Sequence, residues 1–476
     1  MRVAVIGAGP AGMTAAYQLT KGTVELDLYE ASPHIGGMAR TLDLWGQRAD
    51  LGPHRFLSND ARVNRLWLEV VGRDYRLVDR LTRIYYRGRF FHYPLRPFDA
   101  LAKLGPVEAA RCVASYAAGR ARGATEGASF EDWVVARFGR RLFEIFFKTY
   151  SEKLWGIPCA ELDADFATQR IKKLSLLEAI KNAFAVGGAR HKTLTERFAY
   201  PRGGTGQVYE RMAAAVRERG GRVHLQRPVK RVLLNGNRAR GVELEGGEVV
   251  ETDQVVSSMP LSLLVGRLEG APEEVRAAAS ALKFRNTILV YLHVDAPDLF
   301  PDNWLYVHAA ELRMGRLTNF RNWVPELHGD SRASILVAEY WCNDPDPLWR
   351  EPDDALIRLA SGEVRGTGLI RDAAILGGHV VRLPRCYPVY QRGYRQPLEA
   401  IERYLRGVEG LTAIGRYGAF KYNNQDHSIL MGLLAAENVL GQGRHDLWSI
   451  NTDYDSYQES GSITEAGLEL RASRGA

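Results

Sequence analysis

The chain has 476 residues, 46% of them hydrophobic and 25% charged, which is the composition of an ordinary globular protein with two or three domains. Its 63 basic and 56 acidic side chains give a net charge of +7, and the arginines are spread along the chain rather than gathered in a basic tract, so we expect no nucleic-acid partner. Because the chain contains no run of 18 apolar residues and no signal leader before its first expected strand, we expect a cytoplasmic protein without a transmembrane segment.

The first expected elements form a βαβ unit around a glycine-rich turn. Apolar runs over residues 3–6 and 24–29 predict two strands, a helical pattern over 13–19 lies between them, and Glu30 ends the second run. The turn consists of Gly7, Ala8, Gly9, Pro10, Ala11 and Gly12. Its three glycines permit a tight bend, close approach of a pyrophosphate and close helix packing, while the acid can accept hydrogen bonds from a ribose. This unit predicts a dinucleotide-binding site.

Two consecutive glycines and an arginine follow this unit, in the order Gly36, Gly37, Met38, Ala39 and Arg40. Consecutive glycines expose backbone N–H groups, and a guanidinium fork can bind a phosphate. Together with the glycine-rich turn and Glu30 before it, this segment resembles the large FAD-dependent family that contains amine oxidases, protoporphyrinogen oxidase, phytoene desaturases and UDP-galactopyranose mutase. The resemblance implies an FAD cofactor whose diphosphate and flavin lie along these residues, in a Rossmann-like domain of the glutathione reductase type.

Gly52, Pro53 and His54 form the next informative turn, because a Gly-Pro pair favours a tight bend with the histidine at its tip. A histidine in such a place is commonly a surface residue. UDP-galactopyranose mutases carry a similar Gly-Pro-His segment, however, and this resemblance implies that His54 lies near the flavin ring.

A helical pattern over residues 96–128 predicts a cap over the active site, although its mixture of apolar and basic side chains could instead rest on a membrane surface. The block over 129–155 ends in Lys153-Leu-Trp155 and resembles the mutases, whose tryptophan lines the nucleotide-sugar pocket. The mutases place a diphosphate-binding arginine about one residue before Arg170, which makes Arg170 a candidate.

Residues 200–260 return the chain to the cofactor domain, where Val229 takes the place of the family's adenine-contacting valine and Ser258 follows a strand near the diphosphate. From about 275 to 400, alternating apolar residues predict a mainly antiparallel substrate sheet. This stretch is rich in aromatic residues and arginines, which suit a base and a diphosphate but equally suit an aromatic core with a charged face. Tyr387 is its candidate site residue.

The last motif precedes an expected helix over residues 429–440 and contains Gly415, Arg416, Tyr422, Asn423, Asn424, Gln425 and Ser428. It resembles the Gly-Arg-x-Gly-x-x-x-Tyr block of the mutases, which implies that Arg416 and Tyr422 reach the flavin and the substrate phosphates. The start of the helix offers further N–H groups to the flavin. The family often has an acid two residues after the tyrosine, whereas this chain has Asn424 there and Asp426 two residues further on.

Together these motifs predict an α/β fold of three parts. A discontinuous FAD-binding domain takes residues 1–95, 200–270 and 405–476, a helical cap takes 96–199, and a β-sheet substrate domain takes 271–404. The four cysteines lack CxxC spacing and the eleven histidines lack metal-ligand spacing, so we expect reduced thiols and no metal site.

The candidate catalytic residues are His54, Trp155, Arg170, Tyr387, Arg416 and Tyr422, with Arg313 or Arg316 as a further diphosphate ligand. The first hypothesis is a flavoenzyme related to UDP-galactopyranose mutase, acting on a nucleotide sugar or glycosyl diphosphate through flavin N5 without net redox change. The second is a net oxidoreductase, a dehydrogenase, oxidase or desaturase of a small or lipid-like substrate. The third is a flavin-binding protein without catalysis.

Overall fold

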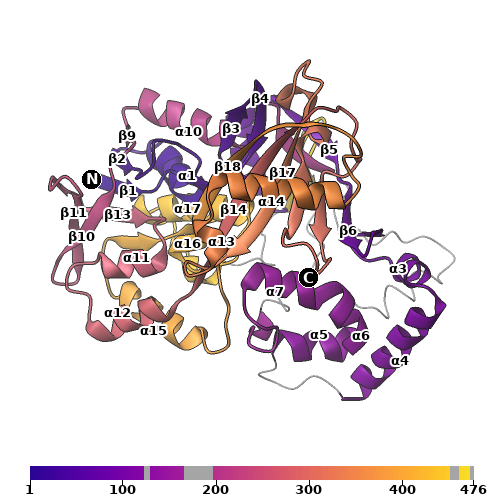
Figure 1. The fold of residues 1–476 in the computed structure, drawn as a ribbon. Coiled ribbons are helices and arrows are strands. Elements are labelled where there is room, and N and C mark those ends of the chain that lie inside the picture. Colours follow the sequence, from indigo (N-terminus) through magenta and orange to yellow (C-terminus); the bar gives the residue numbers. More distant parts are fainter. Residues whose placement is uncertain (123–128, 166–196, 451–459, 472–476) are drawn as a thin grey trace.

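The computed structural model describes residues 1–122, 129–165, 197–450 and 460–471. Among these residues, no helix is long and apolar enough to cross a membrane. The mixed α/β fold predicted from the sequence is confirmed: one parallel sheet and one large, mainly antiparallel sheet organise the chain (Figure 1).

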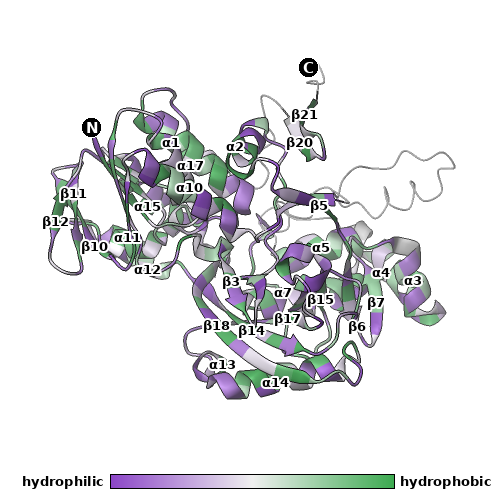
Figure 2. Ribbon diagram, turned by 90° about the horizontal axis from the view of Figure 1, so that it is seen from above, coloured by the Kyte–Doolittle hydropathy of each residue, from purple (hydrophilic) through white to green (hydrophobic). Residues whose placement is uncertain are grey.

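The parallel sheet has five strands in the order β19-β13-β1-β2-β9. Its strands are β1 (Arg2–Ile6), β2 (Glu25–Tyr29), β9 (Arg222–His224), β13 (Gln254–Ser257) and β19 (Leu411–Ala413). Residues 3–6 of the central strand are at most 5% exposed, as expected for a strand covered on both faces. Helix α1 (Pro10–Leu19) packs against α10 (Gly206–Glu218) and α17 (Gln425–Val439), and Figure 2 shows α1 and α17 side by side.

The second sheet has seven strands in the order β18-β14-β17-β16-β15-β6-β7. These are β6 (Thr82–Tyr86), β7 (Arg89–His92), β14 (Phe284–Val294), β15 (Trp304–Val307), β16 (Arg316–Asn319), β17 (Ser334–Cys342) and β18 (Ile375–Pro388). All neighbours are antiparallel except β15 and β6. Helix α14 (Asp353–Gly366) covers one face beside β14 and β18 (Figures 1 and 2), and α13 (Pro347–Arg350) precedes it.

Residues 82–92 differ from the predicted division of the chain. They were expected in the cofactor domain, whose first segment ended at residue 95, but β6 and β7 extend the seven-stranded sheet. The reason is the parallel pairing of β6 with β15, a contact between residues more than 200 positions apart that no local pattern indicates. The other boundaries stay predictions.

The helical part lies beside the edge strands of this sheet (Figure 1). The described part of the pattern over 96–128 forms two helices rather than one, because Gly105 has φ +89° and Pro106 starts the second. The helices are α3 (Pro97–Leu104), α4 (Pro106–Arg122), α5 (Phe130–Phe138), α6 (Arg140–Phe143) and α7 (Thr149–Trp155), with a π-helical turn over Glu144–Lys148 between the last two.

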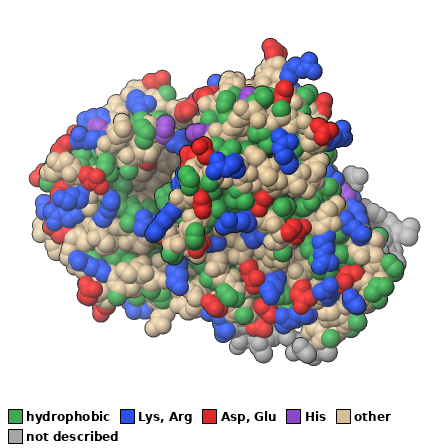
Figure 3. All heavy atoms as spheres, in the orientation of Figure 1, with side chains coloured by type: hydrophobic (Ala, Val, Ile, Leu, Met, Phe, Trp, Pro, Cys, Tyr) green, Lys and Arg blue, Asp and Glu red, His purple; other side chains and the backbone are tan. Residues whose placement is uncertain are grey.

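Smaller elements connect the two sheets. The strands are β3 (Thr41–Leu44), β4 (Gln47–Asp50), β5 (Tyr75–Asp79), β8 (Arg197–Pro201), β10 (Val229–Asn235), β11 (Arg238–Leu244), β12 (Val249–Glu251), β20 (Ser460–Thr464) and β21 (Gly467–Arg471). The helices are α2 (Ala61–Val71), α11 (Leu261–Gly266), α12 (Glu273–Ala281), α15 (Arg395–Arg406) and α16 (Gly415–Gly418). Figure 3 shows the surface hollowed between the part that carries α1 and the part that carries α14.

Candidate active site

The glycine-rich turn after β1 has no room for side chains. Gly7 has φ +96°, and a Cβ atom on it would lie 2.3 Å from the Oγ of Ser258. A Cβ on Gly12 would lie 2.0 Å from the carbonyl oxygen of Gly7. Helix α1 starts immediately after Gly9, with Pro10 in its first turn and no side chain capping its N–H groups. Both glycines are therefore required by the fold, and the open helix end is suited to an anionic group.

Glu30 stands at the carboxyl end of β2 and faces this turn. One of its carboxylate oxygens accepts a hydrogen bond from the backbone N–H of Ala8 and the other from that of Ser32, both at 2.8 Å. Each oxygen retains a further lone pair that a ribose hydroxyl can use. The backbone N–H of Arg227 donates to the carbonyl of Glu30, which brings Val229 on β10 close to the same end of the sheet.

The two consecutive glycines lie against the first turn. Gly37 has φ +52°, and a Cβ on it would be 2.9 Å from the Cα of Gly9. Gly36 donates from its backbone N–H to the carbonyl of Ala8. Arg40 follows with a buried Nε that has no hydrogen-bond partner among the described residues, and burial lowers the pKa of its guanidinium. The residues thus form a cradle that a diphosphate fits, with an uncompensated cation beside it.

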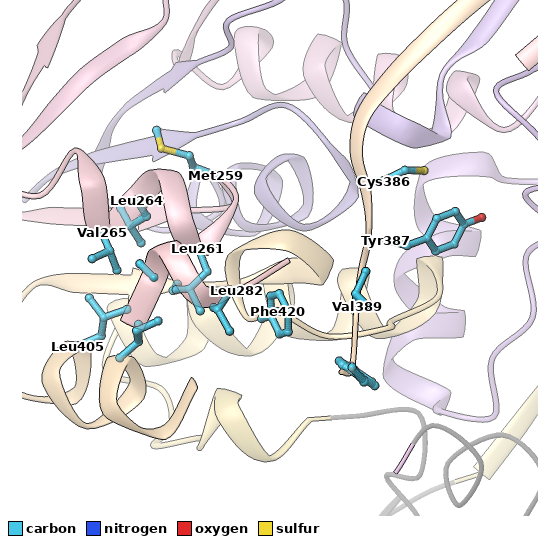
Figure 4. Packing of buried hydrophobic residues seen from close by; sticks show 14 of the residues in the cluster. Met259, Leu261, Leu264, Val265, Leu282, Cys386, Tyr387, Val389, Leu405 and Phe420 are labelled. Atoms are coloured by element: carbon cyan, nitrogen blue, oxygen red, sulfur yellow. The ribbon is translucent and has the colours of Figure 1, made fainter. Parts of the chain in front are cut away.

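Met38 and Ala39 continue this segment towards the second sheet. Ala39 is buried, and the thioether sulfur of Met38 lies 3.8 Å from the thiol of Cys386 on β18. In Figure 4, Cys386 and Tyr387 project from β18 away from the apolar cluster around Leu261. The segment predicted to pass along the cofactor therefore reaches from the parallel sheet to the aromatic residues of the antiparallel sheet.

The last motif closes the same region from the other end of the chain. Gly415 has φ +81°, and a Cβ on it would lie 2.8 Å from the Cβ of Ala11, so this turn rests directly on α1. Asn423 is buried, and its Oδ1 has no partner within the described ranges. Gln425 is held by the hydroxyl groups of Tyr209 and Thr205. The Ser428 hydroxyl donates to the carbonyl of Asn424 at 3.2 Å, so it is engaged within the first turn of α17.

Arg416 lies against a stacked pair of tyrosine rings. Its guanidinium carbon is 4.5 Å from the ring centre of Tyr387 and 4.7 Å from that of Tyr422, and these two rings are stacked 5.6 Å apart. Trp155, at the end of α7, is 5.4 Å from the Tyr422 ring and 6.3 Å from the Tyr387 ring. One nitrogen of Arg416 donates to the carbonyl of Asn423, while Nε and Nη2 are buried without a partner in the described chain. An oxyanion of a cofactor or substrate would satisfy them.

His54 is neutral at physiological pH. Burial, together with the charges of Arg316 and Arg416, lowers the pKa of its imidazole to about 3. Its Nδ1 is buried without a hydrogen-bond partner among the residues described. Gly52, with φ +102°, and Pro53 place this ring at the tip of the turn, and the hydroxyl of Thr205 donates to the His54 carbonyl. A neutral imidazole here can both donate and accept a hydrogen bond.

Comparisons with known proteins agree with this geometry. The sequence pattern of flavin containing amine oxidoreductases matches residues 10–439. The chain belongs to this family of flavin containing amine oxidoreductases. Family membership makes it an FAD-dependent enzyme and confirms the predicted resemblance and cofactor.

Two relatives of this flavoenzyme are named for different activities, a desaturase and an oxidase. It is 27% identical over 287 residues to a zeta-carotene-forming phytoene desaturase of Myxococcus xanthus, a match that covers 55% of this chain and 53% of that protein. It is 27% identical over 319 residues to the coproporphyrinogen III oxidase of Mycobacterium tuberculosis, covering 62% and 67%. The chain thus spans about half the length of the desaturase.

The fold of the flavoenzyme is similar to that of reduced UDP-galactopyranose mutase. The TM-score is 0.82 at 23% sequence identity, and the superposition covers 95% of this chain and 96% of the mutase. At this identity the likeness establishes the fold alone.

Arg170, a predicted diphosphate ligand of the flavoenzyme, lies outside the described residues. Of the two arginines left open, Arg313 is exposed, whereas Arg316 is 17% exposed and its charge acts on His54. Arg316 is directly opposite Glu339 in the β16–β17 register, and its Nε donates to that carboxylate at 2.6 Å. Glu339 was not among the site residues predicted from the sequence. It is the single acid in the buried strand Ser334–Cys342, and that isolation could have indicated it.

Asp50 is a second acid that the sequence did not single out. It is fully buried, and burial raises the pKa of its carboxyl to about 7. The hydroxyl groups of Thr41 and Tyr200 donate to it at 2.6 and 2.7 Å, and so does the backbone N–H of Thr205 at 3.1 Å. Asp50 therefore ties the β3–β4 hairpin to the start of α10, immediately before the His54 turn.

Proposed function

We propose that this flavoenzyme acts on an anionic glycosyl substrate of the nucleotide-sugar class, by chemistry at flavin N5 that resembles that of UDP-galactopyranose mutase. The observation that carries the proposal is the guanidinium of Arg416, which lies against two tyrosine rings and has two buried nitrogens without a partner among the described residues. The fold likeness to the mutase over nearly the whole of both chains supports it.

The residues around Arg416 can each contribute to such a reaction. The Arg416 charge would neutralise a phosphate that leaves the anomeric carbon, and its tyrosine neighbours fix the guanidinium in place. Trp155 packs beside the rings of Tyr387 and Tyr422 and would help to hold them in place. His54, kept neutral, would hydrogen-bond without adding charge. Bound FAD would supply the reactive N5 atom when reduced.

The buried pair of Arg316 and Glu339 favours a second candidate, a net oxidoreductase. Because Glu339 already compensates the Arg316 charge, Arg316 is less available to a diphosphate than Arg416 is. A substrate with little charge near this pair would suit hydride removal, and the names of the desaturase and oxidase relatives support this reading.

The two candidates differ in how they use reduced and oxidised flavin. We would incubate the dithionite-reduced and the oxidised enzyme with UDP-galactopyranose and other nucleotide sugars under anaerobic conditions, following products by chromatography and flavin by absorbance. The proposal predicts conversion by the reduced enzyme alone with no net change in flavin absorbance. Bleaching of the oxidised flavin by a substrate would refute it in favour of the second candidate.

Arg416 provides the matched variants. Arg416→Lys retains the positive charge but loses the planar fork, and Arg416→Gln loses both. We expect kcat/KM to fall in the order wild type, Lys, Gln, with the glutamine variant at least about a hundredfold down. Equal activity of all three proteins, each loaded with FAD, would contradict the role assigned to this residue.

A further inference from the structure

Arg55 and Arg80 are two neighbouring arginines that form no ion pair within the described part of the chain. The Nη1 of Arg55 and the Nε of Arg80 are buried and lack a hydrogen-bond partner among the described residues, and neither guanidinium forms an ion pair there. Burial lowers the pKa of Arg55, and the nearby charge of Arg80 lowers it further. Both residues are only partly buried overall.

Two other arginines with limited exposure have carboxylate partners. Arg83 donates to Asp302 at 2.6 Å, and Arg285, although nearly inaccessible, pairs with Asp346 at 3.3 Å. Asp426 is the acid whose charge raises the pKa of Arg55, but no ion pair joins the two side chains. Two partly buried cations that repel each other without an ion-pair partner in the described chain are costly, so their presence points to an anion that is bound during function.

The backbone holds the two arginines in place. Arg55 directly follows His54, and the next residue, Phe56, is bridged to Ala199 on β8. Arg80 directly precedes Leu81, whose backbone N–H donates to the side chain of Asn303 at 2.8 Å. β5, which ends one residue before Arg80, pairs with β8, so the segments carrying both arginines are joined through the same strand.

A continuous row of aromatic rings connects this pair with Arg416. Arg55 lies close enough to Tyr93 and Tyr306 for both to affect its pKa. From there, successive ring centres are 4.8 Å apart (Tyr93–Tyr306), 5.4 Å (Tyr306–Tyr150), 5.6 Å (Tyr150–Trp341), 6.5 Å (Trp341–Tyr387) and 5.6 Å (Tyr387–Tyr422). The row therefore has free guanidinium nitrogens at each end and ring surfaces between.

We propose that Arg55 and Arg80 bind an oxyanionic group of the substrate, a phosphate or a carboxylate, at the end of the ring row opposite Arg416. The inference rests on the proposed function in taking the ring row as the substrate site. It adds that the substrate carries a second anionic group, separated from the first by a body that lies along the rings. A guanidinium pair suits such a group because each fork can form two parallel hydrogen bonds.

The test is anion binding to the FAD-loaded protein, measured by calorimetry at constant ionic strength with inorganic phosphate as the probe. We expect Arg80→Gln and Arg55→Gln each to weaken phosphate binding at least about tenfold, because one of two adjacent forks is lost. Arg80→Lys should be intermediate. Arg48→Gln is the matched control, since Arg48 is half-exposed and pairs with Asp43 on the β3–β4 hairpin, and it should bind as the wild type does. Repeating the titrations with acetate tells a carboxylate site from a phosphate site.

Thermal unfolding separates a binding role from a structural one. Removing one of two repelling cations should leave the unfolding midpoint of Arg80→Gln unchanged or raised, and phosphate should raise the midpoint of the wild type more than that of the variant. An Arg80→Gln protein that is less stable but binds phosphate normally would overturn the inference. So would phosphate binding that is lost in Arg416→Gln and intact in Arg80→Gln. Because these measurements need no turnover, they remain decisive even if no nucleotide sugar is converted.

Discussion

Replacing Asp50 by asparagine should change how the stability of the protein depends on pH. Burial raises the pKa of this carboxyl from its ordinary 3.8 to about 7 in the folded protein. Between these two values the folded state binds the proton more tightly than the unfolded state, so the stabilisation present below about pH 4 is lost as the pH rises towards 7. At about 1.4 kcal/mol per pH unit, the loss amounts to about 4 kcal/mol.

The Asp50→Asn variant keeps the shape of the side chain but cannot ionise. Its oxygen can still accept from Thr41 and Thr205, and its amide can donate to the Tyr200 oxygen, as the protonated carboxyl of Asp50 would. Urea unfolding of both FAD-loaded proteins should give equal stabilities near pH 4. The variant should then become more stable by an amount that grows up to pH 7 and stays constant above it. A stability difference that does not change between pH 4 and 8 would refute this reasoning.

Three further results are expected. Gly12→Ala should lower FAD content at least about tenfold, because its Cβ would lie 2.0 Å from a carbonyl oxygen. Gly246→Ala is the control and should bind FAD normally, because its Cβ would have no neighbour within 4 Å. Equal flavin absorbance of the two variants would contradict this. Glu339→Gln should destabilise the protein by roughly 3–5 kcal/mol in urea unfolding, because Arg316 would keep a buried charge without a partner. An unchanged unfolding midpoint would show that a group other than Glu339 compensates the Arg316 charge. His54, with its pKa lowered to about 3, should show no imidazole titration by NMR between pH 5 and 8, and a titrating signal lost in His54→Gln would prove it ionises.

The cofactor cradle could be predicted because its constraints are local. The spacing of Gly7, Gly9 and Gly12 and the acid at residue 30 belong to one βαβ unit, and a Cβ atom on Gly7 or Gly12 would meet a neighbouring atom at 2.3 or 2.0 Å. The pairing of Arg316 with Glu339 depends instead on the register between β16 and β17, which a single strand does not reveal.

The arginine pair at the far end of the ring row could not be predicted from the sequence either. Arg55 and Arg80 lie 25 residues apart in two connecting segments, and these segments meet because Phe56 is bridged to Ala199 on β8 and β5 pairs with β8. Nothing distinguishes either residue from the arginines spread along the rest of the chain. The candidate site is therefore predictable where it binds the common cofactor and much less so where it binds a particular substrate.

The order of strands in the parallel sheet has a consequence for how the protein is made. β1 comprises residues 2–6, yet its partners on either side come from residues 25–29 and 254–257, and the sheet is completed by residues 411–413. α1 is then covered by α17, where Gly432 lies against the backbone of Ala11. During synthesis, the domain that contains β1 can therefore close only after nearly the whole chain has been made. A nascent chain stalled before residue 425 would thus expose apolar surface and remain unable to retain flavin, and it would depend on chaperones until the last helix emerged from the ribosome.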